Sequence, residues 1–318
     1  MTAPLVSQRE AGGRTFATAF APATIGNIGP GFDILGLAVT GLGDRVTATR
    51  VDAPGVRIDD AGHPELPTEA SQHTSGIAAQ EVLRLAGAES MGLALCVVKG
   101  LALSGGQGGS AASAVAGAVA ANALLDTPLS PRELMSACLV AEGTVAGRHL
   151  DNIAPSLLGG CILVRSTEEL DVVQLPTPDG LRVVLVHPHQ RMRTVEGRSV
   201  VPTTVSRSTA IQQASNVAAL VIAFARNDDR LLASSINDLI AEPARAPLLT
   251  GFSKAKAAAL QAGALGCSIS GSGPTAFAFA RADTADRIAA AMRDAYAATG
   301  VGSDIHIGDI DTRGARIE

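Results

Sequence analysis

The stretch SGGQGGSAASAVAGAVAANALL, residues 104–125, joins a glycine-rich loop directly to an alanine-rich run with the composition of a buried helix. Glycine costs conformational entropy wherever it is ordered, so a loop with this many glycines needs a compensating role. If a helix begins near Ser110, its free N–H groups point into the loop and carry the positive end of the helix dipole. A polyphosphate is the natural occupant of such a position, and a flexible turn in front of a buried helix is the alternative.

Two common nucleotide-binding motifs do not fit this loop. The P-loop pattern GxxxxGK[ST] requires a lysine directly before Ser110, where Gly109 stands. The dinucleotide pattern GxGxxG is matched only loosely by GQGGSA, and no acidic residue follows about 20 residues later on a second strand. The loop is therefore neither a P-loop nor a convincing Rossmann turn.

Composition predicts a globular protein with a substantial core, since 47% of its 318 residues are hydrophobic. The formal net charge of −5 argues against a nucleic-acid partner, which favours a basic face. No CxxC pair occurs, and all four cysteines lie in apolar runs, so we expect buried, reduced thiols in a cytoplasmic protein. The first 14 residues have no signal-peptide core, and no apolar run is long and unbroken enough for a membrane span.

Hydrophobic periodicity predicts strands and helices without a regular βαβ alternation. Ser130, Pro131 and Glu133 have the spacing of a capping box with proline at the first helical position, which predicts a helix start. The pattern restarts after about residue 168, so we expect two α+β domains, 1–168 and 169–318. Further strands are expected at 15–21, 44–51, 93–98, 159–165, 181–187 and 303–310, a strand-turn-strand at 266–280, helices at 75–88, 208–226, 228–241, 250–262 and 283–300, and a polar loop at 52–74.

Three segments resemble the three motifs of the GHMP kinases, a family of small-molecule kinases. They are PATIGNIGPGFDILGLAV at 22–39, SGGQGGSAASAVA at 104–116 and GCSISGSGPTAFAF at 266–279. Their order and their spread over most of the chain make the resemblance specific. Within the family the homoserine kinases are most similar, through EGTVAGRHLDNIAPSLLGG at 142–160, RTVEGR at 193–198 and AEPARAPLLTGF at 241–252.

The resemblance implies a two-domain α+β fold with the site in the groove between the domains. The N-terminal domain would be like a domain of ribosomal protein S5, with a left-handed βαβ crossover, and the C-terminal domain would be ferredoxin-like. The implied activity is ATP- and Mg²⁺-dependent phosphorylation of the L-homoserine hydroxyl to O-phospho-L-homoserine, in threonine biosynthesis. The resemblance allows a homodimer and implies neither a nucleic-acid nor a membrane partner. Two alternatives stay open: another GHMP kinase of the mevalonate or shikimate type, and a non-catalytic ligand sensor on the same fold.

The phosphate loop departs from the family pattern at one place. The usual loop reads G-L-G-S-S, whereas Gln107, Gly108, Gly109 and Ser110 stand here. Glutamine replaces the leucine and glycine replaces the first serine, while the second serine is kept as Ser110. This change puts the packing of the loop and its nucleotide affinity in question more than it does the family.

By this resemblance, the loop binds the nucleotide, and Ser110 and Glu142 share one Mg²⁺. Without the motif, Glu142 would be interpreted as a solvated helix carboxylate. The third motif, with its turn at 271–274, is expected either to brace the loop or to be a turn that the fold requires. The expected nucleotide-binding residues are Lys99, Ser104, Gly105, Gly106, Gln107, Gly108, Gly109, Ser110 and Ala111.

An amino-acid acceptor needs a cation for its carboxylate and an anion for its ammonium group. Arg198 and Arg245 are the expected carboxylate clamp, because guanidinium groups pair bidentately with carboxylates. Asp33 is expected to hold the ammonium group. Asn27 lies on the same glycine-rich segment and can hydrogen-bond to either end.

The segment HLDN places His149, Asp151 and Asn152 at a loop-to-helix junction. Asp151 can also cap the following helix. Asn152 cannot act as a base, so we expect its amide to orient the attacking hydroxyl. The resemblance implies that a dedicated general base is absent and that the hydroxyl loses its proton late, to the phosphate. Thr194 is expected to supply a further hydroxyl near that phosphate.

Overall fold

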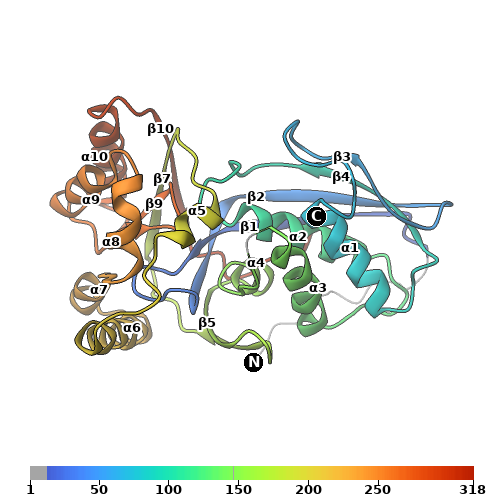
Figure 1. The fold of residues 1–318 in the computed structure, drawn as a ribbon, viewed down its shortest axis with the longest axis horizontal. Coiled ribbons are helices and arrows are strands. Elements are labelled where there is room, and N and C mark those ends of the chain that lie inside the picture. Colours follow the sequence, from blue (N-terminus) through green and yellow to red (C-terminus); the bar gives the residue numbers. More distant parts are fainter. Residues whose placement is uncertain (1–12, 146) are drawn as a thin grey trace.

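The computed structural model describes residues 13–145 and 147–318, and in them two β-sheets are flanked by helices (Figure 1). The larger, seven-stranded sheet has the order β11-β1-β2-β4-β3, with β5 paired to β2 and β6 to β5. Helices α1 (Thr74–Leu85), α2 (Gly109–Asn122), α3 (Pro131–Gly143) and α4 (Ile153–Leu158) lie together on one side of this sheet. Its strands are β1 (Phe16–Gly26), β2 (Leu35–Val51), β3 (Gly55–Asp60), β4 (Gly92–Val98), β5 (Cys161–Ser166), β6 (Asp171–Leu175) and β11 (Arg316–Ile317).

Strand β3 lies at the sheet edge and runs parallel to β4, and α1 connects the two. The expectation of a polar loop over 52–74 is wrong here. As an edge strand β3 has no buried residue, and Arg57, Asp59 and Asp60 are exposed on it. Val56 and Ile58 alternate with charged residues on β3 and pack half-buried against the core, but two apolar residues are too few to indicate a strand in a segment this polar.

The smaller sheet has four antiparallel strands in the order β10-β7-β9-β8. Along the chain, β7 and helices lead to the hairpin of β8 and β9, and α10 leads to β10, which is the ferredoxin-like βαββαβ arrangement. This confirms the fold class predicted for the second domain. The elements are β7 (Arg182–Pro188), α5 (Thr194–Ser199), α6 (Arg207–Arg226), α7 (Asp229–Ser235), α8 (Ala241–Arg245), a 3₁₀ turn (Ala246–Leu248), α9 (Phe252–Gln261), β8 (Cys267–Ile269), β9 (Ala276–Ala280), α10 (Ala285–Ala297) and β10 (Ser303–Asp309).

The chain passes between the two sheets twice. The first passage follows β6, which still pairs with β5 in the larger sheet, so it lies slightly beyond the expected boundary near residue 168. The second follows β10, after which β11 pairs with β1. The larger sheet is therefore completed by residues 316–317, from the far end of the sequence.

Three apolar clusters stabilise these layers. One lies between the larger sheet and α1 to α4, and a second lies between the smaller sheet and helices α9 and α10. The third is shared, because Ile25 and Leu37 from the larger sheet pack with Val183, Phe277 and Phe279 from the smaller one. Burial of this shared apolar surface holds the sheets together and fixes the walls of the space between them.

Helices α2 and α3, which border this space, begin where the sequence predicts, whereas helix α5 was not expected. Ser130 caps α3, its hydroxyl accepts from the Glu133 amide, and Pro131 is the first helical residue, so the predicted capping box is confirmed. Helix α2 is buried on nearly all sides, which its alanines and glycine permit because small side chains let neighbours approach closely. Gly117 packs directly on the backbone of Ser75 in α1, because a Cβ at Gly117 would lie only 2.7–2.8 Å from Ser75 main-chain atoms.

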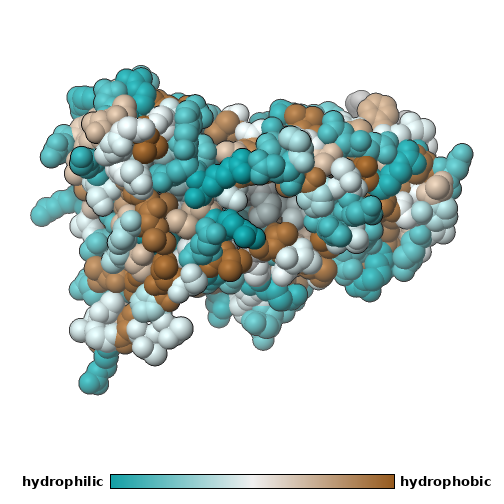
Figure 2. Space-filling view, turned by 45° about the horizontal axis from the view of Figure 1, so that its top comes forward, coloured by the Kyte–Doolittle hydropathy of each residue, from teal (hydrophilic) through white to brown (hydrophobic). Residues whose placement is uncertain are grey.

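One prediction about exposure is wrong. Cys96 is exposed, because it occupies the outward position of β4, whereas the other three cysteines are buried. Among the described residues α6 has the length and apolar composition of a membrane span, and hydrophobic and neutral residues gather over it at the lower left of Figure 2. Helices of globular cores share those properties, and α6 packs Leu220 and Phe224 into the shared cluster.

Candidate active site

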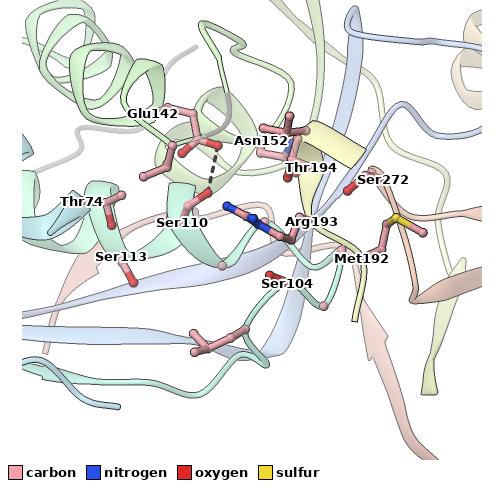
Figure 3. A pocket seen from close by; sticks show the side chains of 18 of the residues that line it. Thr74, Ser104, Ser110, Ser113, Glu142, Asn152, Met192, Arg193, Thr194 and Ser272 are labelled. Atoms are coloured by element: carbon pink, nitrogen blue, oxygen red, sulfur yellow. Dashed lines mark hydrogen bonds between the residues drawn. The ribbon is translucent and has the colours of Figure 1, made fainter. Parts of the chain in front are cut away.

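A cleft of about 750 Å³ lies between the two domains and is lined by loops and helices of both (Figure 3). This volume is in the range of small-molecule sites. The predicted site residues line it, except that Asp33, Gln107 and Ala111 are not among its lining residues. The predicted residues that do line it are Asn27, Lys99, Ser104, Gly105, Gly106, Gly108, Gly109, Ser110, Glu142, His149, Asp151, Asn152, Thr194, Arg198 and Arg245.

The glycine loop takes a backbone path that side chains oppose. Gly106 and Gly108 have φ of 75° and 70°, and Gly108 is the N-cap of α2. The Ala112 amide donates to the Gly108 carbonyl, which leaves the amides of Gly109, Ser110 and Ala111 as the free first turn of the helix. These amides and the helix dipole form an anion-binding position at the floor of the cleft.

Neighbouring segments hold this loop from both sides. The Thr24 amide donates to the Gln107 carbonyl at 3.0 Å, so Gln107 serves the loop through its backbone. On the other side, the Thr275 amide and hydroxyl both donate to the Gly105 carbonyl, at 3.2 and 2.6 Å. The third motif therefore braces the loop. Thr24 and Thr275 lie within the first and third motifs, yet only the fold shows that they meet the loop.

Lys99 is engaged behind the loop. Its ammonium group forms a buried ion pair with Asp44 and donates to the Gly109 carbonyl at 3.1 Å and to the Ser113 hydroxyl at 2.9 Å. The Asp44 carboxylate also accepts from the Gly100 amide. Three partners therefore surround the amine that was expected to reach the nucleotide, and Asp44 is a site-supporting residue that the sequence did not single out.

Ser110 and Glu142 meet at the start of α2. The Ser110 hydroxyl donates to Glu142 Oε1 at 2.9 Å, while buried Oε2 has no hydrogen-bond partner among the described residues. Burial raises the pKa of Glu142 to about 7. A buried carboxylate oxygen without a donor, beside a hydroxyl, fits a hard cation such as Mg²⁺, which takes one or two protein oxygens and keeps phosphates and waters. No cluster of three or more His, Cys, Asp or Glu ligands occurs in the described residues.

The HLDN segment forms the back wall of the cleft. Asn152 Oδ1 accepts from the Thr24 hydroxyl at 2.8 Å, which fixes the orientation of its amide. Asp151 is 3% exposed, and burial first and the Asp33 charge second raise its pKa to about 7. His149 Nδ1 lies 3.7 Å from Asp33, and burial lowers the pKa of His149. Asn152, not Asp151, is the N-cap of α4, and neither side chain caps it.

Asp33 and Arg198 are ion-paired to each other near His149, and Arg198 lines the cleft. Arg198 Nη1 and Nη2 donate to the two Asp33 oxygens at 3.0 and 2.5 Å, and both side chains are less than a third exposed. Asn27 Oδ1 accepts from the Asp33 amide, and its Nδ2 donates to the Gly271 carbonyl. Asn27 therefore ties the first motif to the third.

Arg245 is 2% exposed and donates to the Gly197 and Gly271 carbonyls, both at 2.8 Å. The guanidinium carbons of Arg198 and Arg245 lie 5.4 and 5.3 Å from the ring centre of Phe32, within cation–π range. Phe32 is a site residue that sequence reasoning missed, although it lies inside the first motif. The two arginines thus share one aromatic support and lie side by side.

Thr194 is the first residue of α5, and Figure 3 shows it beside Asn152 at the wall of the cleft. Its place on α5 puts it on the C-terminal side of the cleft, whereas Asn152 comes from the N-terminal side.

The chain matches two family models, "GHMP kinases N terminal domain" over residues 73–160 and "GHMP kinases C terminal" over residues 220–298. A homoserine kinase of Chlorobium phaeobacteroides (strain BS1) is 42% identical over 317 residues, which cover 94% of this chain and 98% of that protein. A homoserine kinase of Xanthomonas campestris pv. campestris (strain B100) is 42% identical over 305 residues, with 95% and 94% covered.

Solved structures show the same likeness. The crystal structure of homoserine kinase from Cytophaga hutchinsonii aligns with a TM-score of 0.93 at 39% identity and covers 98% of this chain and 100% of that one. The L. major mevalonate kinase in complex with R-mevalonate aligns with a TM-score of 0.68 at 17% identity, covering 92% and 95%. At that identity the second likeness concerns the fold alone.

Proposed function

Because this chain belongs to the GHMP kinase family, and within it to the homoserine kinases, we propose that it phosphorylates the side-chain hydroxyl of L-homoserine with ATP. The products are O-phospho-L-homoserine and ADP, and ATP as the donor points to a cytoplasmic reaction. The observation that carries the proposal is that one cleft has both an anion-binding helix start and an ion-paired arginine and aspartate. A donor phosphate and a zwitterionic acceptor need these two sets of groups.

Phosphoryl transfer asks mainly for positioning and charge stabilisation. The amides of Gly109, Ser110 and Ala111 would hold phosphate oxygens at the start of α2. Ser110 and Glu142 would hold Mg²⁺, which when bound neutralises phosphate charge and fixes the phosphate geometry. In this role the Glu142 oxygen that lacks a hydrogen-bond partner would bind the metal ion, which explains why a carboxylate is buried there.

The acceptor end has the groups of an amino-acid site. Arg198 and Arg245 would take the carboxylate, Asp33 the ammonium group, and Asn27 would position Asp33. The Asn152 amide and the Thr194 hydroxyl would orient the acceptor hydroxyl towards the phosphate. The hydroxyl oxygen forms the new bond to phosphorus, the electron pair of the broken bond stays on ADP, and the hydroxyl proton passes to a phosphoryl oxygen. This step needs no side-chain base if the transition state is loose.

An ADP-release assay across L-homoserine, mevalonate, shikimate and L-serine tests the proposal. We expect turnover with L-homoserine at least about tenfold above the other acceptors, because only an amino acid satisfies both charges of the acceptor end. Preference for mevalonate or shikimate would replace the acceptor assignment and keep the kinase. Tight ATP binding with no turnover on any acceptor would favour a ligand sensor.

A further inference from the structure

Most basic side chains in the cleft are engaged by partners from the protein itself. Lys99 and Arg198 are ion-paired, and Arg245 donates to two main-chain carbonyls. At the mouth of the cleft, Arg191 donates to both carboxylate oxygens of Glu65, at 2.7 and 2.8 Å. None of these four cations faces the start of α2 without a partner.

Arg193 differs from them. It lines the cleft, and in the described part of the chain its guanidinium has neither an ion-pair partner nor a hydrogen-bond acceptor. In Figure 3 its side chain extends into the pocket, with the guanidinium directed towards Ser110. The free cation of the cleft thus comes from the C-terminal domain and points to the proposed phosphate position on the N-terminal domain.

The backbone around Arg193 is fixed although its side-chain tip is free. The preceding amide, that of Met192, donates to the Ser104 carbonyl in the phosphate loop at 3.3 Å. The Arg193 amide donates to the Glu196 carboxylate at 3.3 Å, and its carbonyl accepts from the Gly197 amide at 3.0 Å. The residue is therefore anchored to the loop on one side and to α5 on the other, which sets the reach of its guanidinium.

The phosphate position needs such a cation. The loop and helix supply amides and a partial positive charge, but the Lys99 ammonium is neutralised by buried Asp44. In other phosphoryl-transfer enzymes a lysine or an arginine contacts the transferred group. A guanidinium suits this role because it stays charged and offers a planar set of donors to phosphate oxygens.

We propose that Arg193 binds the γ-phosphate of ATP and stabilises the charge of the phosphoryl group during transfer, an assignment that rests on the kinase function proposed above. The bond from phosphorus to the oxygen that bridges to the β-phosphate breaks, and its electron pair stays on ADP. The acceptor oxygen forms the new bond and its proton passes to a phosphoryl oxygen. The Arg193 guanidinium donates to the non-bridging oxygens and stays protonated throughout.

The variant Arg193→Ala tests the assignment in two ways. Calorimetric titration should show ATP affinity falling about tenfold while ADP affinity is unchanged, since only ATP has the γ-phosphate. Steady-state assays should show kcat falling about 10- to 100-fold with the KM for L-homoserine little changed. Arg193→Lys should retain part of the activity, and added guanidine should partly restore Arg193→Ala. Arg207→Ala, which removes an exposed arginine outside the cleft, is the matched control and should match the wild type.

Equal losses of ATP and ADP affinity in Arg193→Ala would overturn the γ-phosphate contact. Equal losses in Arg193→Ala and Arg191→Ala would also overturn it, because they would indicate a general field of positive charge. The titrations need no acceptor, so they report on Arg193 even if the wild-type enzyme fails to phosphorylate L-homoserine. That failure would overturn the proposed function and leave the nucleotide contact standing.

Discussion

Asp33 and Arg198 hold each other through two hydrogen bonds, of 3.0 and 2.5 Å, at the end of the cleft where a zwitterion is expected. In this pair, the Asp33 carboxylate contacts Arg198 as the substrate carboxylate is proposed to do. The Arg198 guanidinium likewise contacts Asp33 as the substrate ammonium group is proposed to do. An amino acid can therefore exchange its own charges for this pair without leaving either side chain unpaired. If Arg198 left Asp33 to bind an acceptor that has no ammonium group, the Asp33 carboxylate would have no cationic partner.

Arg198→Ala should raise the KM for L-homoserine about 10- to 100-fold, because a charged hydrogen-bond donor to its carboxylate is lost. The KM for ATP should change less than twofold, since Arg198 lies away from the start of α2. Initial-rate measurements with each substrate varied in turn check this. A matching rise in both KM values would contradict the carboxylate assignment.

Arg245→Ala should behave differently, because Arg245 is buried and bonded to the Gly197 and Gly271 carbonyls. We expect the free energy of unfolding to fall by about 1–3 kcal/mol, because the buried Gly197 carbonyl loses this donor, whereas the Gly271 carbonyl keeps the donor of Asn27. Urea titrations followed by circular dichroism measure this loss, and Arg198→Ala serves as the comparison. If Arg245→Ala keeps wild-type stability and loses only L-homoserine binding, the two carbonyl contacts do not stabilise the fold and the proposed carboxylate contact is the whole role of Arg245.

Glu142→Gln should change how stability depends on pH. The folded-state pKa of about 7 lies above the ordinary value of 4.5, so the folded wild type binds more protons and loses stability as pH rises between them. Without metal at pH 8, Glu142→Gln should therefore be more stable than the wild type, by at most about 3 kcal/mol. At pH 4.5 and below this gain should vanish.

Chemical denaturation of both proteins at pH 4.5 and pH 8, with metal chelated, measures the effect of Glu142. Asp151 titrates in the same window but is present in both proteins, so its contribution largely cancels in the difference. The same variant should have sharply lower turnover, partly recovered at high Mg²⁺. Parallel stability curves would show that the pKa of Glu142 is not raised, and wild-type turnover at low Mg²⁺ would remove Glu142 from the metal site.

Gly108→Ala should damage the fold as well as ATP binding. A Cβ at Gly108 would overlap the Thr24 hydroxyl, and its φ of 70° adds strain, so a loss of about 1–3 kcal/mol is expected. A loop at the edge of a groove would be expected to accept a side chain without cost to folding, and the Thr24 contact makes that expectation wrong. At Gly109 a Cβ has ordinary contacts, 3.6 Å or more from Lys99 and its other neighbours.

Gly109→Ala is thus the matched control for Gly108→Ala, and thermal melts should place it close to the wild type. Gly87→Ala separates strain from collision, since Gly87 has a φ of 63° and no atom within 4 Å of its Cβ position. If Gly108→Ala and Gly87→Ala lower the melting temperature by the same amount, backbone strain alone accounts for the loss and the Thr24 contact is irrelevant.

Lys99→Met should destabilise the protein by about 3–5 kcal/mol, because it leaves the buried Asp44 carboxylate without its cation. Lys254→Met, at an exposed lysine on α9, should cost less than about 0.5 kcal/mol. Guanidinium titrations of the two variants give the comparison. If the Lys99→Met protein is stable but binds ATP weakly, Lys99 is a nucleotide-binding residue, as expected from the sequence.

The sequence predicts this fold well where the information is local. The capping box at Ser130, the strand before the glycine loop and the three family motifs each occupy a few adjacent residues. Strands β3 and β11 could not be found in that way, because the apolar alternation of β3 is limited to Val56 and Ile58 and β11 has only two residues. Their positions are decided by pairing with β4 and β1, and such pairing depends on the whole fold.

In the candidate site, too, local features could be predicted from the sequence and long-range pairings could not. Residue type and motif position indicate Ser110, Glu142 and Asn152, and all three line the cleft. The pairing of Arg198 with Asp33 spans 165 residues and that of Lys99 with Asp44 spans 55, so neither leaves a signal in any short window. Such pairings decide whether a charge is available to a ligand, and only the packed chain reveals them.

The apolar cluster shared by the two sheets ties their folding together. Neither sheet can bury Ile25, Leu37 or Phe277 on its own, and the larger sheet is complete only when β11, from the end of the sequence, pairs with β1. A chain still emerging from the ribosome therefore lacks both the partner surface and the last strand of its first domain. Heat should melt the finished molecule in one cooperative transition, so that the nucleotide floor and the acceptor end are gained and lost together.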